Sequence, residues 1–127
     1  MMNINNYGIV TGRLSQDVTF FTNRDGSRKA RFTVASTNAY KNADGTRSAQ
    51  FVPLEAFIPA DSKSSIYDLL AKGMLVSVQY TVLNNNYTDR DGTPHYDLVL
   101  QSETVRLQES KAVTDARRAQ AENAGET

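Results

Sequence analysis

Several residue types are missing or scarce in this chain of 127 residues. It contains no cysteine and no tryptophan, and its single histidine is His95. Without cysteine it cannot form disulfides, thiolate zinc sites or a cysteine nucleophile, and one histidine excludes a multi-histidine metal centre. The sequence therefore predicts no bound metal ion, and no motif in it predicts a cofactor.

Long apolar runs are also missing. No run approaches the 18 residues that a membrane-spanning helix requires, and the first residues, MMNINNYG, lack the basic and apolar regions of a secretory signal. The length corresponds to one ordinary domain. We therefore expect one cytoplasmic domain without a membrane partner.

An excess of charge of either sign is absent, because 14 basic residues balance 14 acidic ones. The distribution is nevertheless uneven. Residues 13–47 carry seven basic and three acidic side chains, whereas residues 48–111 carry five basic and eight acidic ones. Bulk charge therefore gives no support to polyanion binding, but a local basic surface in the first half is allowed.

Three Asp-Gly pairs separate segments that are rich in β-branched and aromatic residues, which is a strong signal for hairpin turns. The segment from Met74 shows the clearest alternation of apolar and polar residues. The turns are predicted at Asp25-Gly26, Asp44-Gly45 and Asp91-Gly92, and the strands at Tyr7–Leu14, Val18–Asn23, Lys29–Thr37, Ser48–Ile58, Met74–Tyr87 and His95–Arg106.

A single short helix is predicted over Ser64–Lys72. It follows the polar run DSKSS, has apolar residues at helical spacing and precedes Gly73, a residue suited to the position after a helix. Hairpin-linked strands with one helix favour a small closed all-β barrel over βαβ units. From Lys111 the composition becomes alanine-rich without aromatics, which predicts a flexible or frayed-helical tail over residues 111–127.

The strand around Phe51 has two different faces. Val52, Leu54, Ala56 and Ile58 form a purely apolar set, and the alternate residues include Phe51, Glu55 and Phe57. Aromatic rings exposed beside charges can stack with nucleic-acid bases. The alternative is that both rings pack under a loop or a partner subunit.

The hairpins repeat this mixture. Tyr40 precedes Lys41 and a turn followed by Arg47, and Tyr87 precedes a turn that contains Arg90. A ring and a cation on one arm can contact a base and a phosphate of an extended polyanion. A hydrolase or nuclease has no such support, because no nucleophile elbow or phosphate-binding glycine loop accompanies His95.

Four segments resemble the bacterial and phage single-stranded DNA-binding proteins. GIVTGRLSQDVTF is similar to their first strand, KARFTVASTNAY to the second, AQFVPLEAF to the third, and AKGMLVSVQYTVLNNNYTDRDGTPHYDLVLQSETVRLQES to their long hairpin and returning strand. The resemblance covers roughly residues 4–110. It implies a five-stranded OB-fold barrel over residues 1–110, with one short helix between barrel strands 3 and 4 and long hairpin arms.

The resemblance also implies a function. Proteins of that family are not enzymes, bind single-stranded DNA with little sequence preference during replication, recombination or repair, and commonly form homotetramers; a dimer is the alternative here. Its stacking rings correspond to Tyr40, Phe51, Phe57 and Tyr87, and the candidates for phosphate contacts are Arg24, Arg28, Lys29, Arg31, Lys41, Arg47, Lys72 and Arg90.

The chain departs from that family at several points. It lacks the usual tryptophans, has Asn84–Asn86 where relatives are basic, and ends in AENAGET instead of an acidic tip that recruits partners. The short tail without that tip predicts a bacteriophage or mobile-element version without tip-mediated recruitment. The alternatives are an OB-fold accessory protein for RNA, primosome or recombination assembly, and a protein-interaction module.

Overall fold

The computed structural model describes residues 4–62 and 65–108, and its regular secondary structure is almost entirely β. The six predicted strands are all present, with ends that agree to within about two residues. They are β1 (Gly8–Leu14), β2 (Thr19–Thr22), β3 (Arg28–Thr37), β4 (Ala49–Ile58), β5 (Leu75–Thr88) and β6 (Pro94–Leu107). The predicted tail, residues 111–127, lies outside the described residues.

Five of the strands close into a ring. Going round it, β1 pairs with β5, β5 with β6, β6 with β4, β4 with β3, and β3 again with β1. All pairs are antiparallel except β4–β6, which is parallel and joins Glu55 to Gln101. β2 stands outside the ring and pairs only with β3. This order is consistent with the OB fold that the resemblance implies.

Gly12 allows the ring to close. β1 and β3 pair at Arg13 and Leu14, the two residues that follow Gly12, and a Cβ atom on Gly12 would collide with the backbone carbonyl of Ala35. A side chain at this position would therefore push β1 away from β3.

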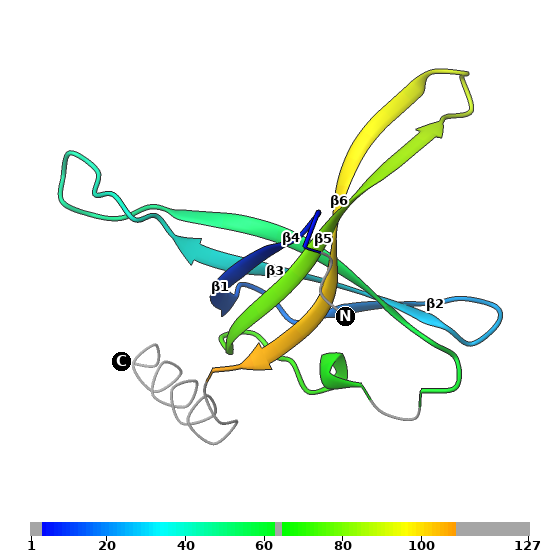
Figure 1. Ribbon diagram of the computed structural model, residues 1–127, viewed down its shortest axis with the longest axis horizontal. Helices are drawn as coiled ribbons and strands as arrows, with labels where there is room; N and C mark the ends of the chain where they lie inside the picture. Colours follow the sequence, from blue (N-terminus) through cyan, green and yellow to red (C-terminus); the bar gives the residue numbers. More distant parts are fainter. Residues whose placement is uncertain (1–3, 63–64, 109–127) are drawn as a thin grey trace, which may run out of the picture.

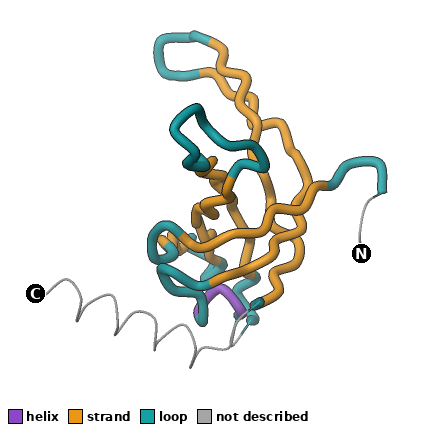
Figure 2. The backbone as a smooth tube through the Cα atoms, turned by 90° about the vertical axis from the view of Figure 1, so that its left-hand side faces the viewer, coloured by secondary structure: helices purple, strands orange, loops and turns teal. Residues whose placement is uncertain are grey.

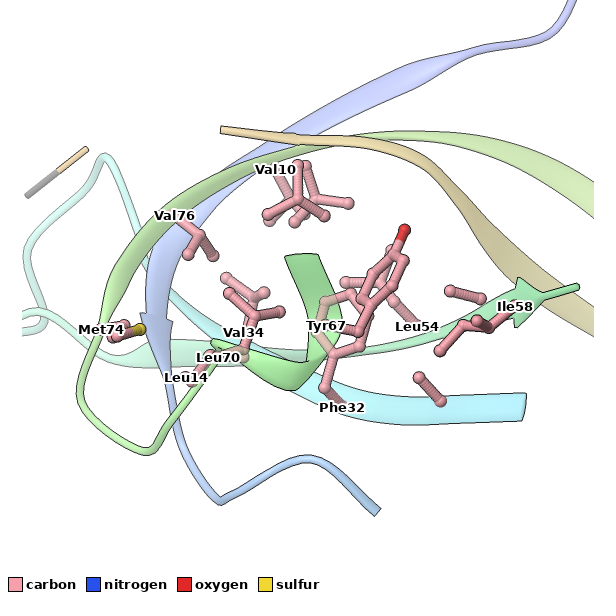
Figure 3. Packing of buried hydrophobic residues seen from close by; sticks show 14 residues of the cluster. Val10, Leu14, Phe32, Val34, Leu54, Ile58, Tyr67, Leu70, Met74 and Val76 are labelled. Carbon is pink, nitrogen blue, oxygen red and sulfur yellow. The ribbon is translucent and has the colours of Figure 1, made fainter. Parts of the chain in front are cut away.

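The inside of the ring is filled by aliphatic residues (Figure 3). Val34, Leu54, Val76 and Val78 are completely buried. Tyr67 joins this core, and its hydroxyl lies 2.8 Å from the hydroxyl of Ser102, so the buried polar group has a partner. Burial raises the pKa of Tyr67, which keeps the phenol protonated.

The predicted helix over Ser64–Lys72 is wrong in its extent. Within the described residues, this segment contains only a three-residue 3-10 turn, η1 (Ile66–Asp68), capped by the side chain of Ser65. One turn is enough to bury Tyr67 and Leu70, whereas Leu69, part of the apolar spacing that predicted the helix, is exposed. At Gly73 the chain adopts a φ of 92° and turns into β5.

Three hairpins project from the ring in different directions (Figure 1). Each predicted Asp-Gly pair lies at a hairpin tip, and all three glycines have φ between 82° and 90°, a conformation that glycine adopts readily. In each five-residue turn, the first N–H donates to the carbonyl of the fifth residue. The tips are Asn23–Ser27, Asn42–Thr46 and Asp89–Thr93.

The β5–β6 hairpin is the longest of the three. From Leu83 to Val99 it extends beyond the ring, and we call this segment the arm. Its tip and η1 lie at opposite ends of the molecule (Figure 1, Figure 2). Among the described residues, no helix has the length and apolar character needed to cross a membrane.

Candidate nucleic-acid interface

The outer face of β4 carries two exposed aromatic rings. Phe51 is 64% exposed and Phe57 is 61% exposed, whereas Leu54 and Ala56, on the alternate positions, are buried. The orientation that alternation predicted for this strand is confirmed. Because the two rings are six residues apart, they lie roughly 20 Å from one another along the strand.

Two cations of β3 stand beside these rings. Lys29 is directly opposite Phe57, and Arg31 is directly opposite Glu55, so all four side chains are on one face. Glu55 contacts both cations: its Oε1 is 2.8 Å from Arg31, and its Oε2 is 3.7 Å from Lys29. We call the surface formed by Lys29, Arg31, Phe51, Glu55 and Phe57 the platform.

A groove runs between the platform and the arm. Its arm side is lined by amides and aliphatic side chains, and Lys29, Arg31, Glu55 and Phe57 line the other side. The groove thus combines a ring, two cations and several hydrogen-bonding amides. The remaining lining residues are Asn23, Ala56, Leu83, Asn84, Asn85, Val99 and Gln101.

Tyr87 lies further along the arm and is paired with His95. The two rings are stacked, with centroids 4.7 Å apart and planes 10° apart. His95 Nε2 is 2.8 Å from Asp89 Oδ2, and this hydrogen bond, with those from the backbone N–H groups of Thr93 and Asp91, lowers the pKa of Asp89. The contacts fix one face of Tyr87 and leave its ring half-exposed.

The two faces of the arm are distinct. Leu83, Asn85 and Tyr87 alternate along β5 and share one face, and Leu83 and Asn85 place that face at the groove. Tyr96 and Leu98 are opposite Asn86 and Asn84 on the other face. Asn84 still borders the groove, but Tyr96 and Leu98 do not line it.

The loop between β3 and β4 holds a third group of predicted residues. Tyr40 and Lys41 are exposed, while Arg47 donates hydrogen bonds to the backbone carbonyls of Ala39 and Asn38. This loop continues from the Phe51 end of β4, so Tyr40 extends the platform away from the groove.

The remaining predicted cations lie apart from the groove. Arg28 forms a two-point ion pair with Asp68 at 2.9 Å and covers Phe20, with 4.9 Å from its guanidinium carbon to the ring centroid. Arg24 and Arg90 are exposed in hairpin tips, and Lys72 is exposed just before β5. Among all the predicted residues, the groove brings together Lys29, Arg31 and Phe57.

Comparison with known proteins decides the family. The single-strand binding protein family matches residues 5–108. The chain belongs to this family. Members of the single-strand binding protein family are non-catalytic DNA-binding proteins.

Several bacterial relatives support this assignment. Single-stranded DNA-binding protein 1 of Staphylococcus aureus (strain MSSA476) is 28% identical over 110 residues, which cover 87% of this chain and 69% of that protein. Single-stranded DNA-binding protein 3 of Listeria innocua is 29% identical over 103 residues, which cover 81% of this chain and 63% of the relative.

Sequence reasoning missed some residues of this family member's candidate interface. Asn85 lines the groove because the arm stands opposite the platform, and Gln101 lines it because β6 pairs with β4 at Glu55. Phe21 shares the outer face with Lys29, yet its segment TFFT shows no alternation that would assign a face. In the described part of the chain, no three His, Asp or Glu side chains are grouped so as to hold a metal ion.

Proposed function

We propose that this protein binds single-stranded DNA with little sequence preference and without catalysis. The observation that supports this most strongly is the platform, where exposed rings of β4 lie beside cations of β3 at the edge of a groove. Every base offers a face for stacking, so rings bind bases without reading their identity. Cations neutralise the phosphates that accompany those bases.

The proposed roles follow from position. Phe57 stacks with a base in the groove, and Phe51 with a base further along the platform. Tyr40 and Tyr87 add a ring from each flanking hairpin. Lys29 and Arg31 contact phosphates in the groove, and the more peripheral phosphate contacts are assigned to Arg24, Lys41, Arg47 and Arg90.

Arg28 and Lys72 receive structural roles in this proposal. Arg28 fastens η1 to β3 through Asp68, and the backbone N–H of Lys72 donates to Asp17. Neither lines the groove. Substituting Arg28 should therefore affect folding more than binding, whereas a substitution of Lys72 keeps the backbone hydrogen bond and should have little effect on either.

We assign the binding activity to a domain of residues 1–110 and place its work in the cytoplasm, during DNA replication, recombination or repair. Membership of the single-strand binding family supports this role. We also propose a bacteriophage or mobile-element source. Phage genes flanking the coding sequence would support that source, and conserved chromosomal neighbours would contradict it.

We further propose that the protein forms a homo-oligomer, a tetramer or a dimer, through the outer face of β1. Ile4, Tyr7 and Ile9 are exposed together on this segment, and a contiguous exposed apolar surface favours burial by a partner. Light scattering should give a mass above that of one chain, and Ile9→Arg should lower it. A monomeric wild-type protein would contradict the proposal.

The experiment that tests the proposed function is an anisotropy titration. A labelled oligo-dT, a duplex of equal length and an oligo-U of equal length are compared at about 50 and 200 mM salt. We expect the tightest binding for oligo-dT and much weaker binding for the duplex. Equal affinities for single strand and duplex would contradict the function, and tighter binding of oligo-U would redirect it to RNA.

A further inference from the structure

Phe21 of β2 extends the platform beyond the ring. Phe21 is directly opposite Lys29, and Lys29 is directly opposite Phe57. Residues that face each other across antiparallel strands point to the same side of the sheet. The three side chains therefore form one row on the outer face, with the cation between the two rings.

The spacing in this row suits a bound chain. Neighbouring strands are about 4.8 Å apart, so the backbone positions of Phe21 and Phe57 are separated by roughly 10 Å. Asn23, two residues after Phe21, lines the groove that also contains Phe57. The surface around Phe21 is thus continuous with the groove and is not a separate patch.

The neighbours of Phe21 match those of the platform rings. Its ring is 46% exposed, and the guanidinium carbon of Arg31 lies 5.4 Å from the ring centroid. Arg31 holds the ring on one side, and Lys29 stands next to it on the sheet. A half-exposed ring between two cations has the chemistry that binds a base together with its phosphates.

The adjacent Phe20 is a ring of the same strand that points to the other face. It is opposite Ala30, which is completely buried, and it is covered by Arg28. Although Phe20 is itself 36% exposed, it therefore lies on the side of β2 away from Lys29 and the groove. Phe21 does not belong to the buried core, so core packing does not account for its position.

We propose that Phe21 is a further base-stacking subsite, which carries the single strand from Phe57 past Lys29 onto β2. The proposal rests on the proposed function, since it extends the same path. Lys29 then contacts the phosphate between the two stacked bases. The subsite accepts any base, because stacking on a ring does not depend on base identity.

The absence of tryptophan gives a direct test. Phe21→Trp and, as matched control, Phe20→Trp each introduce the protein's single tryptophan, whose fluorescence is followed while oligo-dT is added. We expect quenching at position 21 and little at position 20, because only the first ring stacks with a base. Equal quenching at both positions, or none at position 21, would overturn the proposal.

A second pair of variants measures the contribution to affinity. Phe21→Ala removes one stacked base, so this variant should bind oligo-dT about fivefold more weakly or worse. Phe20→Ala should change the affinity less than twofold. Thermal melting of both variants controls for folding. If the wild-type protein binds oligo-dT but changes at position 21 have no effect, the subsite alone is overturned. If the wild-type protein does not prefer the single strand, the proposed function is overturned as well.

Discussion

The platform and the arm border the same groove but are chemically different. The platform contributes Lys29 and Arg31, opposed by one carboxylate, Glu55. Between Leu83 and Val99 the arm has one Lys or Arg, at its tip, and three aspartates. One wall therefore attracts phosphates, and the other offers amides and aliphatic side chains, with the ring of Tyr87 further along the arm. Charge-dependent binding should thus depend on the platform.

The largest effect is expected from a platform ring. Phe57→Ala removes one stacked base, worth about 1–3 kcal/mol, and should weaken oligo-dT binding roughly 5- to 150-fold. Tyr96→Ala is the matched control, because Tyr96 is 77% exposed but lies on the arm face away from the groove. Anisotropy titration measures both variants. Equal losses in the two would remove the distinction between groove rings and other exposed rings.

The next effect concerns the charge of the platform. Glu55→Gln frees Lys29 and Arg31 from their shared counterion, so one more phosphate should be neutralised. The slope of log K against log salt should steepen by about 0.7. If the charge effect vanishes near 1 M salt, binding tightens roughly eightfold at 50 mM and threefold at 200 mM.

Glu103→Gln is the control for this change, since Glu103 is exposed and does not line the groove. An identical gain in both variants would mean that only total charge matters. Weaker binding of oligo-dC but not of oligo-dT by Glu55→Gln would instead show that Glu55 accepts a hydrogen bond from a base.

A smaller effect is expected on the arm. His95→Ala removes the ring that supports Tyr87; such aromatic pairs contribute about 0.5–1.5 kcal/mol, so binding should weaken roughly two- to twelvefold at most. At pH 8 the salt slope should stay unchanged, in contrast to the platform. His95→Phe should restore most of the affinity. A changed slope in His95→Ala would contradict the division between the two walls.

Acid should have the smallest effect and should act on the hairpin tips. Hydrogen bonds lower the pKa values of the tip aspartates Asp25, Asp44 and Asp89. The largest cause is the hydrogen bond with the side chain of Ser27, Thr46 and His95, respectively. Because these pKa values are lower in the folded state, the ionised aspartates stabilise the turns at pH values above the unfolded-state pKa. This stabilisation is lost as the pH falls through the folded-state pKa.

Amide chemical shifts in the three turns, followed by NMR from pH 6 to pH 2, would check this. Their titration midpoints should fall below the ordinary aspartate value of 3.8, while amides of the ring strands stay unchanged over the upper part of the range. Midpoints above 3.8 would contradict the hydrogen-bonded turns.

Local patterns predicted most of the fold. Period-two alternation placed the strands, and the Asp-Gly pairs placed the three tips, because both signals depend on a few neighbouring residues. The helix over Ser64–Lys72 was mispredicted because burial of Tyr67 and Leu70 needs only one turn. Apolar spacing over so few residues is the same for a turn and for a helix.

The candidate site was less predictable, since it depends on contacts between distant segments. Alternation correctly turned Phe51 and Phe57 outward. The sequence did not show that Arg28 and Lys29 differ in role, because the ion-pair partner of Arg28, Asp68, is forty residues away in the chain. Phe21 and Gln101 became part of the surface only through strand register and the fold of the arm.

The regular pairing of the two strands of the arm means that its length could be changed in fixed steps. Asn85 faces Asp97 and Asn86 faces Tyr96, so deleting residues 85–86 together with 96–97 would shorten the arm by about 7 Å. Every remaining side chain would keep its face. Deleting one residue from each strand would instead turn the outer half over. The length of the hairpin can therefore change by two residues in each strand without changing the face on which the remaining side chains lie.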